Sequence, residues 1–359
     1  MYLCNLVRSA CGRHIIRMRH FSHWLMILTA ATAIARAPAS EPELLTELVA
    51  AQEASHQGDM GAADSLSRSL ISRWPENPTG YYARAALVQI RTMGCQGVLL
   101  QKELRENLQK AVETGTERIR QHPEDTWARY ILGLALGLEG VLAVREGSLW
   151  QAYRKATRSV DELEEVLRRD PSFADAWLPL GTYHFWRGEA LKRWVWLPFI
   201  SDTRAQGIAE MRRAAQEGRT TKVSAQSMLL WALLMTDQYE EALRISGPLV
   251  ERYPANRSFL WARAEAFKAL GRWREAEEAF AAVSRTFGPE YDGCPGPVEI
   301  RAKRGMALAE LGECERARPL LEAALAYTPP PTDASNFAGI QAEARHYLER
   351  CAQVQAKRR

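Results

Sequence analysis

The chain lacks most of the features that would identify an enzyme or a nucleic-acid-binding protein. Its 359 residues contain six cysteines and no CxxC pair, so neither a zinc ribbon nor a redox dithiol is indicated. HExxH, Walker and GxSxG motifs are also missing. The formal charge is only +4, and four arginines before residue 36 account for it, so no large basic surface for nucleic acid is expected. We therefore predict a non-enzymatic protein that needs no metal or other cofactor.

Long apolar runs are missing too, since none reaches the roughly 18 residues of a membrane-spanning helix. A shorter apolar run, residues 24–35, follows the basic segment 13–20 and ends in the small-x-small sequence Ala33-Ile34-Ala35. Basic, apolar and small-residue segments in this order are typical of a secretory signal. We expect residues 1–39 to be a targeting leader of an exported protein, periplasmic or associated with the cell envelope. No integral membrane domain is expected after cleavage, and a mitochondrial presequence is the alternative.

One pattern recurs along the rest of the chain: a helical stretch, a turn, a second stretch with Ala near its start, and then Pro. Copies occur at residues 57–63, 237–242, 270–276 and 311–317. Glycine in most of these turns allows positive φ between antiparallel helices, and the closing proline ends the second helix. The pattern resembles the tetratricopeptide repeat (TPR), and in particular bacterial exported TPR proteins with elongated middle repeats. The resemblance implies an all-α, right-handed α-solenoid of about seven helical hairpins over residues 40–359.

The spacing of the copies predicts repeats of two lengths. The family unit is about 34 residues, but the repeats over about 78–222 each carry about 14 more, which corresponds to about four helical turns. In the third repeat we expect two long helices, and in the fourth we expect Pro198 to interrupt the pair. The remaining boundaries are regular repeats over 44–77 and 223–331 and a capping helix over 334–356.

This register also brings two cysteines together. Cys314 begins the second helix of the seventh repeat, and Cys351 lies near the end of the capping helix, which should run antiparallel to it. Because the start of one helix and the end of the other lie at the same edge, we predict a Cys314–Cys351 disulfide. Two separate buried thiols are the alternative.

The resemblance implies a concave groove lined by the first helices of successive repeats. The central positions are aromatic or apolar, whereas grooves that hold charged peptide termini carry Lys, Arg and Asn there. The candidate groove residues are Trp127, Tyr130, Leu134, Leu178, Phe185, Trp186, Trp231, Leu234, Met235 and Trp261. Trp194, Trp196 and Phe199 form a candidate lid. In the alternative interpretation these side chains fill the groove and belong to the core.

Two functions follow from this groove. The first is a scaffold that binds a protein or peptide partner, because exposed apolar patches with aromatic anchors usually mark interaction sites. The second is a periplasmic carrier or transport-accessory protein for a small apolar or lipid-like ligand. A co-purifying lipid would favour the carrier, and a filled groove would count against it.

Overall fold

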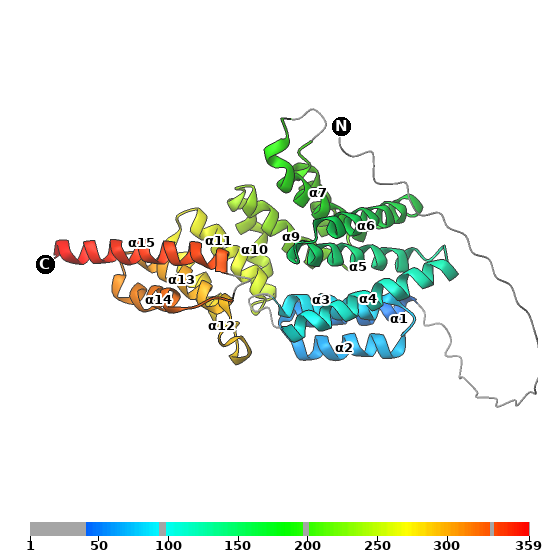
Figure 1. The fold of residues 1–359 in the computed structure, drawn as a ribbon, viewed down its shortest axis with the longest axis horizontal. Helices are drawn as coiled ribbons and strands as arrows, with labels where there is room; N and C mark the ends of the chain where they lie inside the picture. Colours follow the sequence, from blue (N-terminus) through cyan, green and yellow to red (C-terminus); the bar gives the residue numbers. More distant parts are fainter. Residues whose placement is uncertain (1–40, 93–97, 197–200, 331–333, 359) are drawn as a thin grey trace, which may run out of the picture. The chain divides into compact units, whose positions relative to one another are not determined.

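The computed structural model describes residues 41–92, 98–196, 201–330 and 334–358, so the expected leader, residues 1–39, lies outside the described residues. The described residues are helical, without strands (Figure 1). The α-helices of the first four hairpins are α1 (Glu41–Gln57), α2 (Met60–Arg73), α3 (Pro78–Arg91), α4 (Val98–Gln121), α5 (Thr126–Arg145), α6 (Leu149–Arg169), α7 (Trp177–Leu191) and α8 (Arg204–Glu217). Those that follow are α9 (Lys222–Met235), α10 (Tyr239–Arg252), α11 (Arg257–Ala269), α12 (Trp273–Arg285), α13 (Pro295–Glu310), α14 (Cys314–Ala326) and α15 (Ala334–Arg358). Short 3₁₀ helices are η1 (Ala174–Ala176), η2 (Lys192–Trp194) and η3 (Pro289–Tyr291).

The helices pack as seven hairpins in series, from α1–α2 to α13–α14, and α15 packs on both helices of the last one. The first helices of successive hairpins are also in contact: α1 with α3, α3 with α5, α7 with α9, and α9 with α11. Serial stacking of this kind makes the chain an all-α solenoid, which confirms the predicted fold class.

Local sequence signals define the helix ends. The side chains of Asp59, Asn77, Asp125 and Asn256 each accept a hydrogen bond from a backbone N–H in the first turn of the helix that follows. Gly58, Gly271 and Gly312 occupy hairpin turns with positive φ, at 86°, 68° and 76°. The fifth hairpin has no turn glycine, and Asp237 takes its place with φ of 60°.

The extra residues of the long repeats are distributed unevenly. In the third hairpin both helices are long, with 20 and 21 residues, as the sequence predicts. In the second hairpin they lengthen only α4, which has 24 residues against 14 in α3. In the fourth hairpin the helices are short, with 15 and 14 residues, and η2 follows α7 directly. Pro198, expected to interrupt this pair, lies outside the described residues.

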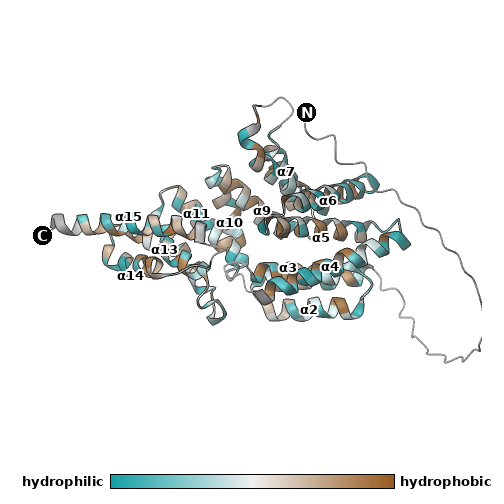
Figure 2. Cartoon of the chain, viewed as in Figure 1, coloured by the Kyte–Doolittle hydropathy of each residue, from teal (hydrophilic) through white to brown (hydrophobic). Residues whose placement is uncertain are grey.

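Helix α5 is long and apolar enough to cross a membrane by length and composition, but 56% of its most apolar window is buried. Helix α5 packs tightly on α6, as shown by the hydrogen bond that Ser159 Oγ donates to the Gly133 carbonyl at 2.6 Å. A Cβ on Gly133 would lie 2.8 Å from Leu163 Cγ. Although α5 is among the most apolar helices (Figure 2), its burial between α3, α4 and α6 makes it a core helix of the stack.

A contact between distant repeats brings the first hairpin onto the turn between the fifth and sixth. Tyr253 donates its hydroxyl hydrogen to Glu53 Oε2 at 2.9 Å, across 200 positions of sequence. Asn256 Nδ2 donates to the His56 carbonyl at 3.1 Å. The His56 ring lies 5.8 Å from the Tyr253 ring and 6.4 Å from that of Phe259. We call this set of contacts the closure contact.

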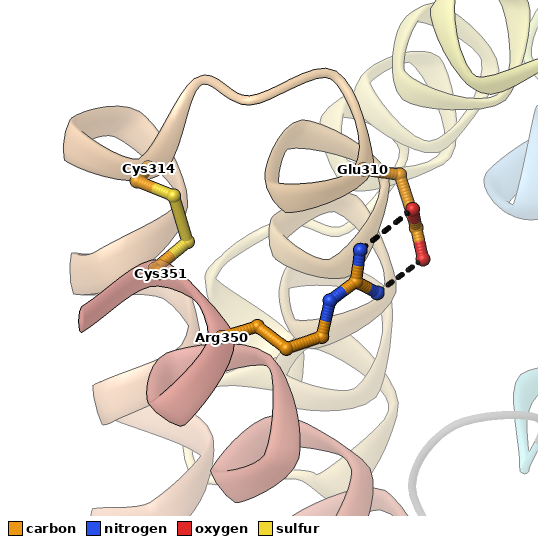
Figure 3. Close-up of a disulfide and its surroundings, with 4 residues drawn as sticks. All are labelled: Glu310, Cys314, Arg350 and Cys351. Atoms are coloured by element: carbon orange, nitrogen blue, oxygen red, sulfur yellow. Dashed lines mark hydrogen bonds and ion pairs between the residues drawn. A yellow bond between two sulfur atoms is a disulfide. The ribbon is translucent and has the colours of Figure 1, made fainter. Parts of the chain in front are cut away.

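The C-terminal helix is attached to the last hairpin at two points (Figure 3). Cys314 and Cys351, the pair expected from the sequence, form a disulfide with a Cα–Cα distance of 5.5 Å. The preceding residue, Arg350, donates to both carboxylate oxygens of Glu310 on α13, at 2.7 and 3.2 Å. These hydrogen bonds hold the pKa of Glu310 below its ordinary value despite its partial burial. Cys294 is disulfide-bonded as well.

Candidate partner-binding groove

Three of the predicted groove residues are core residues, which corrects the sequence-based assignment. Trp127, Tyr130 and Phe185 are all buried. Trp127 Nε1 donates to Thr79 Oγ1 of α3 at 2.9 Å, and the Tyr130 ring lies 5.0 Å from that of Phe173. The physical reason is that neighbouring helices, of the same hairpin or of an adjacent one, cover these side chains, so they are not available to a partner.

Five other residues predicted to line the groove are half-buried: Leu134, Leu178, Trp231, Leu234 and Trp261. The two indoles meet edge to face, with centroids 6.4 Å apart. Each N–H is used, since Trp231 Nε1 donates to Ser258 Oγ at 3.1 Å and Trp261 Nε1 donates to Glu265 Oε1 at 3.1 Å. Both rings are therefore fixed in place between α9 and α11.

The exposed part of the predicted groove consists of Trp186 and Met235. Their exposed fractions are 48% and 40%, which are high for apolar side chains of this size. Trp186 lies in the last two turns of α7, and Met235 is the last residue of α9. These two side chains are free to contact a partner.

Sequence reasoning missed four further exposed apolar residues on first helices. These are Val49 on α1, Ile90 on α3, and Val141 and Val144 on α5. Val141 follows Leu134 by seven residues, or about two helical turns, so extending the groove pattern through the elongated third repeat would have found it. With Trp186 and Met235, these residues give exposed apolar side chains on the first helices of five consecutive hairpins. We call these six residues the concave apolar set.

Next to Trp261, the surface of α11 and α13 is polar. Lys303 Nζ lies 2.9 Å from Glu299 Oε1, forms a second ion pair with Glu265, and is 5.5 Å from the Trp261 ring centroid. Burial lowers the pKa of Lys303, but the two carboxylates outweigh it, so the pKa is raised and the lysine stays charged. Because two carboxylates already pair with this cation, it is poorly suited to hold the carboxylate of a peptide.

The candidate lid is described only in part. Trp196 is 72% exposed, so its ring does not pack over the groove. The side chain of Trp194 and the whole of Phe199 lie outside the described residues.

Other sites in the described part of the chain do not point to chemistry. His184 Nδ1 lies 2.6 Å from Glu210 Oε2, and both side chains are mostly buried, so this histidine joins α7 to α8 as a core pair. No group of three or more His, Cys, Asp or Glu with metal-site spacing occurs among the described residues. A surface hollow of about 490 Å³ lies beside α10 and is mostly charged; its lining is Glu240, Glu241, Leu243, Arg244, Arg263, Phe267 and Arg272.

Comparison with known proteins agrees with this architecture. Residues 227–292, which include α9 to α12 almost entirely, match the tetratricopeptide repeat family. This segment is similar to tetratricopeptide repeats. This match confirms the repeat resemblance in the region where Asp237–Ala242 and Leu270–Ala276 carry it. No curated protein matches the chain.

Solved TPR structures resemble the chain at low sequence identity. A tetratricopeptide repeat protein from Parabacteroides merdae ATCC 43184 has a TM-score of 0.39 and 15% identity, covering 84% of this chain and 99% of that one. Yeast Tom70 has a TM-score of 0.33 and 11% identity, with coverages of 88% and 91%. The TPR2AB domain of yeast Sti1, solved as a complex with pHSP90, has a TM-score of 0.27 and 13% identity, with coverages of 87% and 100%.

Proposed function

We propose that the protein is a non-enzymatic TPR scaffold that binds a protein or peptide partner through the concave apolar set. The observation that carries this proposal is the exposure of apolar side chains on the first helices of five consecutive hairpins. Exposed apolar side chains that share a surface usually mark an interaction site.

Trp186 and Met235 are the anchors of this surface. An indole that is half exposed and fixed on a helix can enter a partner pocket with little loss of side-chain entropy, and tryptophan is enriched among residues that dominate binding energy. Methionine adapts its shape to irregular apolar surfaces. We therefore expect an apolar segment of the partner, such as one face of an amphipathic helix, to lie across α7 and α9.

We further propose that the protein is exported. The N-terminal segment has the order of a secretory signal, and the Cys314–Cys351 disulfide suits an oxidising compartment. The carrier alternative gains no support, because the hollow of about 490 Å³ is lined mainly by Arg and Glu side chains.

The test compares two double variants of equal apolar loss. Trp186→Ala/Met235→Ala removes the two anchors, and Leu149→Ala/Trp150→Ala removes exposed apolar side chains from a second helix instead. Trp231 is left intact, because its indole packs between α9 and α11 and its loss would disturb folding.

The partner is first isolated by cross-linking in the native cell envelope, and its affinity is then measured by calorimetry. Loss of one dominant anchor commonly costs about 2 kcal/mol, or roughly 30-fold in Kd, so we expect Kd to rise by at least this factor in the first variant, which loses two anchors, and to stay unchanged in the second. Equal affinities for all three proteins would refute the groove as the binding site.

A further inference from the structure

The tip of the third hairpin exposes a second group of apolar side chains, on the second helix of that hairpin. Leu149, Trp150 and Tyr153, all in the first turns of α6, are 70%, 68% and 61% exposed. The Trp150 and Tyr153 rings are stacked, with centroids 5.8 Å apart and an interplanar angle of 24°. We call these three residues the α6 tip.

The α6 tip is exposed because α6 is longer than α7, the first helix of the next hairpin. Helix α6 has 21 residues and α7 has 15, a difference that corresponds to about 9 Å of helix. Tyr153, Val160 and Leu167 recur every seven residues and so lie on one stripe of α6. Val160 and Leu167 pack against the core shared with Trp177 and Leu180 of α7. At Tyr153 the same stripe continues with no helix of the next hairpin covering it.

The charge around the α6 tip is positive, whereas the chain beyond residue 35 is balanced, with 43 basic and 43 acidic residues. Residues 141–158 contain four basic residues and one acidic residue, Glu146, which is paired with Arg105 at 2.8 Å. One of the four, Lys155, forms an ion pair with Glu139. Among the described residues, the exposed Arg145 and Arg154 have no carboxylate partner. They flank the aromatic pair in sequence on α5 and α6.

The end of the fourth hairpin also carries basic residues beside exposed apolar ones. The segment that follows α7 carries Lys192 and Arg193 and then the exposed Val195 and Trp196. In a stack of antiparallel hairpins, consecutive tips lie at the same edge. One edge of the third and fourth hairpins therefore combines exposed tryptophan and tyrosine with basic side chains.

We propose that the α6 tip docks on an anionic lipid bilayer surface. Stacked tryptophan and tyrosine rings present apolar faces together with polar N–H and O–H groups, which is the combination that favours the interface between headgroups and acyl chains. Leu149 would enter the acyl boundary, while Arg145 and Arg154 keep their guanidinium groups among anionic headgroups. A protein partner is less well matched, because the tip is the end of a hairpin and not a groove. This proposal extends beyond the proposed function, since it uses other residues and another class of partner.

The test is flotation of the full chain with vesicles of phosphatidylcholine and phosphatidylglycerol in equal parts, and with vesicles of phosphatidylcholine alone. A tip variant, Leu149→Ser/Trp150→Ser/Tyr153→Ser, is compared with a matched variant, Val49→Ser/Ile90→Ser/Met235→Ser, which alters three exposed apolar residues of the concave set. Both variants retain the N-terminal segment, so its own affinity for lipid cancels between them. Circular dichroism checks that helicity is unchanged, as expected for exposed positions.

We expect the unaltered and matched proteins to float with anionic vesicles. The partition coefficient of the tip variant should be lower by roughly tenfold or more. Arg145→Gln/Arg154→Gln should lower partitioning roughly 30-fold at low ionic strength, and added salt should erase that difference. Equal flotation of the tip variant and the unaltered protein would overturn the proposal. So would self-association through the tip without vesicle binding, detected by sedimentation velocity. Loss of partner affinity in the matched variant alone would bear only on the groove.

Discussion

Removal of the Cys314–Cys351 disulfide should release the C-terminal helix from the solenoid. The two cysteines are 37 positions apart, and a cross-link over such a loop removes about 13 cal/mol/K of entropy from the unfolded chain, or about 3.8 kcal/mol at 25 °C. Because each repeat of a solenoid contacts mainly its neighbours, this loss should fall on α15 and the hairpin beneath it and not on the whole chain. We expect the protection of α15 amides from hydrogen exchange to fall roughly 600-fold.

The variant for this measurement is Cys314→Ala/Cys351→Ala under oxidising conditions, because reduction would also affect the disulfide of Cys294. Both sulfurs are buried, so the substitution removes packing as well. Comparison of the variant with the unaltered protein, both fully reduced, measures that packing loss separately, because neither then holds a disulfide. Unchanged exchange in α15 of the oxidised variant would refute the reasoning.

Two further predictions concern packing and pH. In a urea titration, Gly207→Ala should destabilise the fourth hairpin by about 1–3 kcal/mol, although alanine has the better helix propensity. The reason is that the new Cβ would lie 2.5 Å from the Gly181 carbonyl oxygen and from the Phe185 backbone nitrogen. Gly339→Ala is the control: its Cβ would have no neighbour within 4 Å, so it should be neutral or stabilising. Burial lowers the pKa of His56 below 6.5, with Arg252 adding to this and Glu53 opposing it, so the folded state favours the neutral ring. The contribution of His56 is therefore complete above its unfolded pKa and lost as pH falls through the folded value. After correction for the intrinsic exchange rate at each pH, protection at residues 53–58 should fall as pH drops below 6.5, the ordinary pKa of histidine, and a His56→Phe variant that kept this pH dependence would count against the explanation.

The hairpins could be predicted from the sequence because their signals are local. Gly58, Gly271 and Gly312 mark turns that need positive φ. Asp125 caps the start of the long helix α5, and Asp170 marks the end of the long helix α6. The pairing of Cys314 with Cys351 follows from helix direction alone, once the last hairpin and its cap are recognised.

The groove could be predicted only in part, because helical periodicity gives the face of a helix but not what covers it. Trp127 and Phe185 lie in the predicted register, yet contacts with α3 in one case and with α8 in the other bury them. Trp186 and Met235 occupy equivalent positions near helix ends, where the neighbouring hairpin no longer reaches. The closure contact between His56 and Tyr253 was not predictable at all, because it depends on the summed rotation of four intervening hairpins.

The most direct test of the binding proposal is site-specific photocross-linking in the native cell. A photoreactive amino acid placed at Met235 would lie in the concave apolar set, and one placed at the exposed Glu278 of α12 would lie on a second helix. Our account predicts a discrete cross-linked partner from position 235 and none from position 278. A partner captured from position 278 but not from 235 would contradict it.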